Sequence, residues 1–178
     1  MTATVAAALA WIYCELASYH AEGSSQRISD RDISAGTLLR EIFSTKSQRL
    51  LRDADFGTPF RSTEDDDLDK LFYRWEGVAC EFEDKHLQDR AARAVAAGRD
   101  FLELLSKHSG AYDRRKGTED YHWRSVPTED EIGRDEFEQH TRDNIAELRR
   151  AARDTLSKFE DWERSFRKLL PKGNAPIT

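Results

Sequence analysis

The chain has 178 residues, of which 35% are charged and 38% hydrophobic, and its formal net charge is −6. This length fits one domain, and this composition is typical of a helix-rich chain. The net negative charge argues against a general binder of nucleic acid or of anionic membranes. Four prolines and no run of alternating β-branched residues leave little room for a sheet. We therefore expect a single all-α domain over residues 1–178, with nucleic acid an unfavoured partner.

The first predicted helix lies in the alanine-rich apolar segment 5–16. Ala8, Ile12, Leu16 and Tyr19 recur at helical spacing and so share one face. The segment lacks the basic residues that open a secretory signal peptide, and it is too short to cross a bilayer. We expect an amphipathic helix that packs on the rest of the chain and no membrane contact. An anchor at a membrane interface is the alternative.

A second shorter helix is predicted to begin where Ser29 and Asp32 have capping spacing, and to fray near residues 53–57. Its apolar residues follow at largely helical spacing: Ile33, Leu38, Leu39, Ile42, Phe43, Leu50 and Leu51. Residues 1–57 are therefore expected to hold two shorter helices.

Residues 62–108 are predicted to form one long helix, or two nearly collinear helices. Ser62 or Thr63 would cap an acidic first turn. Apolar residues at helical spacing form two groups on either side of a polar stretch: Leu68, Leu71, Phe72, Trp75, Val78 and Phe82, then Val95, Phe101, Leu102 and Leu105. Gly77 and Gly98 each cost about 1 kcal/mol relative to alanine inside a helix, so a kink or a short break is the alternative.

The strongest pattern predicts a second long helix over residues 128–170. Thr128 and Glu131 have capping-box spacing, but Gly133 falls in the first turn, so the helix begins at Thr128 or at Arg134. An apolar stripe follows in steps of three and four: Ile145, Leu148, Ala152, Leu156, Phe159, Trp162, Phe166 and Leu169.

We expect the two long helices to pair as an antiparallel hairpin, and the two shorter helices to complete an antiparallel helical bundle. The acidic start of one long helix would then lie beside the basic end of the other. The charged residues concerned are Glu64, Asp65, Asp66, Asp67 and Asp69 at the start, and Arg164, Arg167, Lys168 and Lys172 at the end. A tail, residues 171–178, follows.

The lengths of the predicted helices suggest an interaction protein. Two helices of about 20 residues cover only about half of the hairpin if they lie side by side, and large exposed apolar patches usually mark interfaces. The alternative is that the two shorter helices stack end to end along the hairpin and complete a three-helix bundle. The sequence therefore predicts a protein partner or a homodimer, and a role as scaffold, adaptor or regulatory subunit. The predicted contacts are aromatic residues of the two stripes: Trp75, Phe82, Phe159, Trp162 and Phe166. The alternative for each is the chain's own core.

The connector loop 109–127 combines basic and aromatic residues: Arg114, Arg115, Lys116, Tyr121, His122 and Trp123. Such residues can neutralise and stack on a nucleotide or a nucleic acid. The preferred alternative is a cap, in which Tyr121 and Trp123 close the end of the bundle.

No metal site or cofactor is expected. Glu83 with His86, and Glu119 with His122, have the Glu-x-x-His spacing of di-iron bundles, but the second pair lies in the connector loop. No phosphate-binding glycine loop or nucleophile elbow occurs in the sequence, so an enzyme is not the main expectation.

The alternative function is catalytic. Arg134, Asp135 and His140 resemble the short motif of HEPN ribonucleases, all-α proteins in which an arginine, a polar residue and a later histidine act on RNA. The resemblance implies that His140 moves protons and that Arg134 holds the scissile phosphate. The acidic neighbours Glu136 and Glu138 would repel that phosphate.

The two cysteines, Cys14 and Cys80, have no metal or redox spacing. We interpret them as reduced, buried thiols of a cytoplasmic protein, with a disulfide between them as the alternative. The alanine- and arginine-rich composition gives the impression of a bacterial chain.

Overall fold

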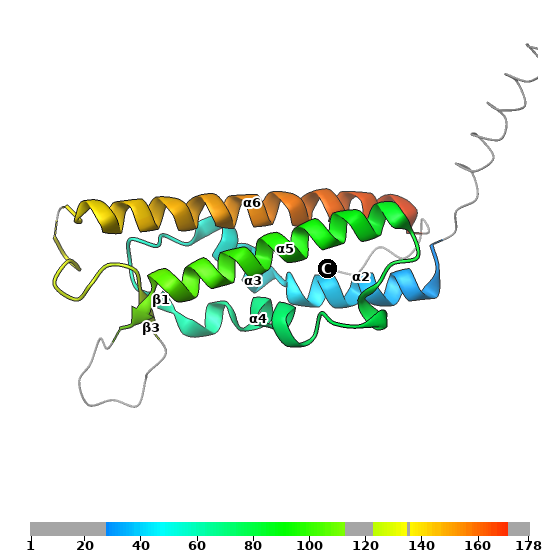
Figure 1. Cartoon of the computed structure of the whole chain (residues 1–178), viewed down its shortest axis with the longest axis horizontal. Helices are drawn as coiled ribbons and strands as arrows, with labels where there is room; N and C mark the ends of the chain where they lie inside the picture. The colour runs from blue at the N-terminus through cyan, green and yellow to red at the C-terminus, as the bar shows by residue number, and fades with distance from the viewer. Residues whose placement is uncertain (1–27, 113–122, 135, 171–178) are drawn as a thin grey trace, which may run out of the picture. The chain divides into compact units, whose positions relative to one another are not determined.

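The computed structural model describes residues 28–112, 123–134 and 136–170. The chain divides into two compact units, one formed by Met1–Ile28 with Lys168–Thr178 and the other by Ser29–Arg167. Nearly all described residues belong to the second unit, whose elements are labelled in Figure 1. The helix predicted in segment 5–16, Cys14 and the tail 171–178 lie outside the described residues.

Ser29–Arg167 is mostly helical, as predicted. Its α-helices are α2 (Asp30–Ile42), α3 (Thr45–Asp53), α4 (Asp66–Tyr73), α5 (Lys85–His108) and α6 (Gln139–Leu169). Two short 3₁₀ helices, η1 (Ser62–Glu64) and η2 (Val78–Cys80), flank α4.

The second predicted helix is split into α2 and α3 at Phe43 and Ser44. The Ser29 hydroxyl accepts the backbone N–H of Asp32 at 3.1 Å, as the spacing predicted, and caps α2. The Ser44 hydroxyl accepts the backbone N–H of Ser47 at 3.2 Å and caps α3. A second capping serine therefore starts a new helix in the middle of the apolar pattern.

The single long helix predicted over 62–108 is wrong, because the chain turns between α4 and α5. Gly77 has a φ of 76°, a conformation that glycine adopts at little cost. The Arg99 guanidinium of α5 donates to the carbonyl oxygens of Leu71 at 2.7 Å and Trp75 at 3.1 Å. The two helices therefore lie side by side and are not collinear.

The prediction that the last helix begins at Thr128 or Arg134 is also wrong, since α6 begins at Gln139. Thr128 and Glu131 do form half of a capping box, because the Thr128 backbone N–H donates to the Glu131 carboxylate at 3.0 Å. A turn follows, in which Gly133 has a φ of 87°. The motif here closes a turn and does not start the long helix.

A small antiparallel sheet was not predicted. It contains β1 (Phe60–Arg61), β2 (Gly110–Ala111) and β3 (Trp123–Ser125), with β3 in the centre. Strands of two or three residues show no periodicity, so the sequence gives no sign of them.

Arg124 of β3 joins this sheet to the helices. Its guanidinium donates to the Asp65 carboxylate at 2.8 Å and to the Leu105 carbonyl oxygen at 3.2 Å. Burial raises the pKa of the Asp65 carboxyl group, and the Arg124 charge lowers it in part.

The acidic start of α4 does not lie beside the basic end of α6, contrary to the prediction. Closer cations neutralise it: besides Arg124 on Asp65, Lys46 lies 3.7 Å from Asp66 and Lys70 pairs with Asp67. Lys46 belongs to α3, Lys70 to α4 itself and Arg124 to β3. The predicted hairpin placed neither α3 nor β3 beside these acidic residues.

Three contacts show how α5 and α6 pair. Arg90 pairs with Asp161, the Thr155 hydroxyl donates to the Ala97 carbonyl oxygen at 2.9 Å, and His108 lies 2.9 Å from Glu147. The residue numbers rise along α5 and fall along α6, so the two helices run antiparallel (Figure 1).

Helices α4, α5 and α6 and the junction after α2 meet at Gly98 of α5. A Cβ atom built there would lie 2.4 Å from Leu71 Cδ1, 3.5 Å from Phe43 Cζ and 3.8 Å from Thr155 Cγ2. Leu71 belongs to α4, Phe43 directly follows α2 and Thr155 belongs to α6, so the missing side chain lets these segments approach α5 closely.

We expect Gly36→Ala to destabilise the fold. A Cβ atom at position 36 would lie 2.2 Å from Cζ of the buried Phe166 ring. Overpacking of this kind costs about 1–3 kcal/mol, which exceeds or cancels the gain of about 1 kcal/mol in helix propensity. Urea unfolding measures the difference, with Ser34→Ala on the exposed side of α2 as the control. A clear rise in the free energy of unfolding for Gly36→Ala would contradict this packing.

Candidate functional site

Four of the five predicted partner contacts lie in the chain's own core. Phe82, Phe159, Trp162 and Phe166 are at most 6% exposed. Phe43, directly after α2, stacks on Phe159 with ring centroids 4.4 Å apart, and the Phe82 ring centroid lies 6.0 Å from that of Trp162 and 6.5 Å from that of Phe166. The prediction that the α6 stripe is exposed is therefore wrong, because α2 and the segment between α4 and α5 cover it.

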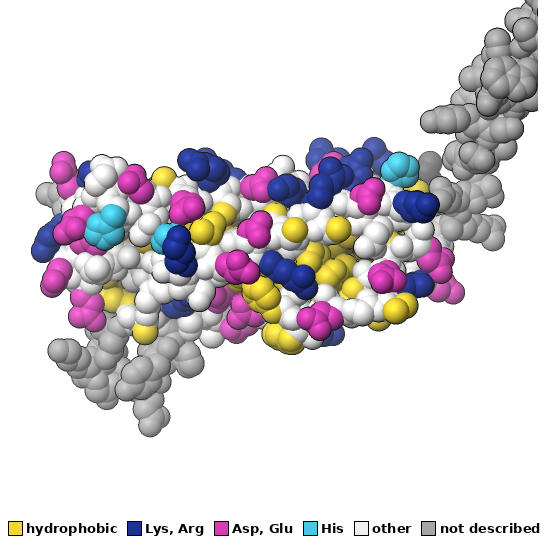
Figure 2. Space-filling view, in the orientation of Figure 1, with side chains coloured by type: hydrophobic (Ala, Val, Ile, Leu, Met, Phe, Trp, Pro, Cys, Tyr) yellow, Lys and Arg dark blue, Asp and Glu magenta, His cyan; other side chains and the backbone are white. Residues whose placement is uncertain are grey.

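Exposed apolar side chains gather instead at the end of α4 and in the turn that follows. Phe72 is 40% exposed, Tyr73 63% and Val78 66%, and these are the large hydrophobic residues exposed in the described part of the chain. The predicted contact Trp75 lies among them and is half-buried against Phe82. We term Phe72, Tyr73, Trp75 and Val78 the 72–78 patch. Figure 2 shows apolar side chains over this part of the molecule.

Two arginines hold the backbone of the 72–78 patch. Arg99 of α5 binds the Leu71 and Trp75 carbonyl oxygens, and Arg31 of α2 donates to the Val78 carbonyl oxygen at 2.8 Å. Exposed apolar groups on a fixed backbone lose little conformational entropy when a partner covers them.

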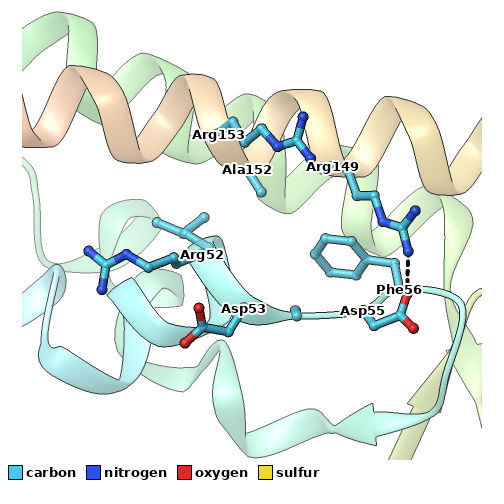
Figure 3. A pocket seen from close by; sticks show the side chains of 9 residues that line it. Arg52, Asp53, Asp55, Phe56, Arg149, Ala152 and Arg153 are labelled. Atoms are coloured by element: carbon cyan, nitrogen blue, oxygen red, sulfur yellow. Dashed lines mark hydrogen bonds and ion pairs between the residues drawn. The ribbon is translucent and has the colours of Figure 1, made fainter.

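A pocket of about 250 Å³ lies between the end of α3 and the middle of α6 (Figure 3). Its floor is apolar and buried, and its rim is mostly charged. The floor is formed by Leu51, Phe56 and Ala152, and the residues around it are Arg52, Asp53, Ala54, Asp55, Arg149 and Arg153. Arg149 pairs with Asp55, and Arg52 lies 3.4 Å from Glu160. Because acidic groups offset most of the arginine charge, the pocket has little selectivity for an anion.

Two further pockets lie end to end between α5 and α6, with volumes of about 260 and 400 Å³. Asp154 lines both, so the two pockets adjoin each other, and we term them together the α5/α6 groove. The side chains that line it are Arg90, Arg93, Ala97, Asp100 and Leu104 of α5, with Glu147, Arg150, Ala151, Asp154, Ser157, Lys158 and Asp161 of α6. Its floor is formed by small or apolar residues and its walls are charged.

The candidate catalytic residues Arg134 and His140 are both exposed beside the turn that precedes α6. His140 Nδ1 lies 3.4 Å from the Glu138 carboxylate, and Nε2 lies 3.2 Å from the Thr141 hydroxyl. Among the described residues, no hydrogen bond or ion pair joins Arg134 to His140. Neither lines one of the three pockets above, so their role as catalytic residues stays a prediction.

Buried Glu131 organises that turn. Its carboxylate accepts the backbone N–H groups of Thr128 at 3.0 Å and Glu138 at 2.9 Å, and the hydroxyls of Thr128 and Thr141 at 3.0 Å each. These hydrogen bonds lower the pKa of Glu131 to about 2. Glu131 is therefore an ionised structural group near neutral pH and not a proton carrier.

Most of the predicted loop site lies outside the described residues, namely Arg114, Arg115, Lys116, Tyr121 and His122. Trp123 is half-buried in β3, and the Arg61 guanidinium lies 5.8 Å from its ring centroid. Ligand binding and capping by this loop both stay predictions.

Glu83 lies just before α5 and His86 in its first turn. Within residues 28–112, 123–134 and 136–170, no three His, Cys, Asp or Glu side chains are grouped to hold a metal ion. Cys80 is buried, and this burial raises the pKa of its thiol. The thiol is therefore protonated near neutral pH.

We expect the Glu131 carboxylate to stabilise the fold in a pH-dependent way. Its pKa is about 2 in the folded chain and near 4.5 when unfolded, so its contribution is complete above pH 4.5 and is lost as the pH falls toward 2. Glu131→Gln should therefore lower the free energy of unfolding at pH 7, and the difference from the unmodified chain should shrink between pH 4.5 and 2. Denaturant titration at several pH values tests this, and a pH-independent difference would refute it.

Comparison of the chain with protein-family models, with curated proteins and with solved structures gives no match. None of the helices that the structure describes is long and apolar enough to cross a membrane.

Proposed function

We propose that this chain is a protein–protein interaction module, acting as a scaffold, adaptor or regulatory subunit, and that the 72–78 patch binds its partner. The observation that supports the proposal most is that the exposed large hydrophobic residues lie close together in the chain. In the described part of the chain, the large exposed hydrophobic residues all fall between Phe72 and Val78. Clustered exposed apolar groups commonly mark interaction sites on monomeric proteins.

The chemistry of the 72–78 patch suits a binding hot spot. Tyrosine and tryptophan are enriched among residues that dominate interface energy, and Tyr73 is largely exposed while Trp75 is half-buried. Exposed Arg74 and Glu76 lie on either side of Trp75 in the sequence and supply a polar rim. Trp75 also contacts Phe82, so the patch continues into the aromatic core and rests on a rigid base.

The size of the patch favours a small contact with a protein segment. A standard interface buries about 800 Å² per partner, which is more than four side chains supply. We therefore take the partner element to be an amphipathic segment, such as a helix, that lays apolar side chains on the patch and polar ones on the rim. In this proposal, the helices form an antiparallel bundle that holds the 72–78 patch in place.

The alternative, a small HEPN-like RNA-acting enzyme, has no supporting geometry. Arg134 and His140 are exposed, Glu138 lies beside His140, and neither candidate lines one of the three pockets described above. The acidic neighbour would repel the phosphate that the arginine is meant to hold.

We expect Tyr73→Ser combined with Val78→Ser to abolish partner binding without unfolding the chain. Both side chains are more than half exposed, so the change in stability should stay within about 0.5 kcal/mol. Affinity capture of the full chain from its native host, followed by quantitative mass spectrometry, measures the loss, and circular dichroism verifies the fold. Tyr73→Phe keeps the ring and is the matched control. If the serine variant captures the same proteins in the same amounts, the 72–78 patch is not the binding surface.

A further inference from the structure

The α5/α6 groove presents small and charged side chains in a regular order. Along α5, Arg93, Ala97 and Asp100 follow in steps of four and three, and all three line the groove. Ala97 in the middle is 6% exposed, and Ala151 of α6 lies in the same pocket. Small residues at the centre of a helix face allow another helix to approach closely.

Two charges in this row are not neutralised within the described part of the chain. Arg93 donates to the backbone oxygen of Asp89, but no ion pair is formed by Arg93 or by Asp100 there. They are seven residues apart on one face of α5, which is about 10 Å along the helix axis. A second helix with the same row, running antiparallel, would place its aspartate opposite this arginine and its arginine opposite this aspartate.

A second pair of opposite charges lies on α6 at the same level, although Asp161 of this pair already contacts Arg90 of α5 in the same chain. Arg150 and Asp161 both line the groove, and their midpoint along α6 falls beside Thr155. The midpoint of Arg93 and Asp100 falls beside Ala97 on α5. The Thr155 hydroxyl donates to the Ala97 carbonyl oxygen at 2.9 Å, so the two midpoints lie at the same height. One two-fold axis can therefore pass at the level of the midpoints on both helices.

We infer that the α5/α6 groove binds the same groove of a second copy of this chain, with a two-fold axis at the level of Ala97 and Thr155. In this homodimer α5 packs antiparallel to α5 of the second copy, and α6 to α6. Arg93 faces Asp100 and Arg150 faces Asp161 across the interface. A self-complementary face of this kind is what a two-fold interface requires.

The size of the face supports this occupant. Helix α5 has 24 residues and is about 36 Å long, and two adjacent helices present a width of about 20 Å. The resulting area of about 700 Å² is close to the 800 Å² per partner of a standard interface. The contact is mainly polar, so we expect the dimer to weaken as salt screens its charges. It uses none of the 72–78 patch and does not depend on the function proposed above.

Charge reversal tests the dimer directly. Sedimentation equilibrium of the full chain at low ionic strength should show dimers, and the dimer dissociation constant should rise by about tenfold or more for Arg93→Asp or Asp100→Arg, because like charges then face each other twice. The double variant Arg93→Asp with Asp100→Arg should dimerise as the unmodified chain does. An equal mixture of the two single variants should form heterodimers, since both contacts are then restored.

The control is Glu103→Arg on the same helix, an exposed position that lines neither pocket of the groove. It changes the net charge as Asp100→Arg does, and it should leave the dissociation constant unchanged. Circular dichroism confirms that every variant is folded. A monomeric chain at low salt, a single variant that dimerises normally, or a double variant that stays monomeric would each overturn the inference.

Discussion

The rest of this structure depends on the need to cover the aromatic stripe of α6. Trp162 is fully buried, and Phe159 and Phe166 on either side are almost so. Helix α2 covers this stripe because Gly36 has no side chain to hold it away from Phe166. The turn between α4 and α5 closes the remaining side with Phe82. The chain therefore buries the α6 stripe in its own core. Exposure of this stripe no longer supports a homodimer.

In this core, close packing of the aromatic rings is achieved at the cost of one hydrogen-bond donor that is unpaired within the described part of the chain. Aromatic pairs add about 0.5–1.5 kcal/mol each beyond the area they bury, whereas exposed ion pairs add about 0–1 kcal/mol. The Trp162 indole N–H is buried and has no hydrogen-bond partner among the described residues, which costs about 1–3 kcal/mol. Surface charges contribute little to holding the helices together, so their arrangement is free to serve recognition.

Local signals in the sequence predicted local structure well. The stripe of α6, the cap at Ser29 and the contact between Thr128 and Glu131 all form. The break before α5 was only the alternative in the prediction, because Trp75 and Phe82 fit a continuous helix as well as they fit a turn. Its cause is Gly77 in the left-handed conformation, together with the Asp84 carboxylate that caps α5. The exposure of a side chain depends on the tertiary structure and cannot be read from local patterns. Of the predicted contacts, Trp75 alone therefore belongs to the 72–78 patch, and no pattern in the sequence distinguished Tyr73 as exposed.

The two surfaces proposed here differ in the force that would drive binding, and this difference separates their roles. The 72–78 patch is apolar, and burial of apolar surface does not weaken when salt is added. The α5/α6 groove is charged, so its contacts lose strength within the ionic strengths that cells reach. The patch lies at the end of α4 and in the following turn, whereas the groove lies on α5 and α6. A chain that pairs through the groove therefore keeps its patches free for partners, and salt would change the number of patches per particle without changing the affinity of each.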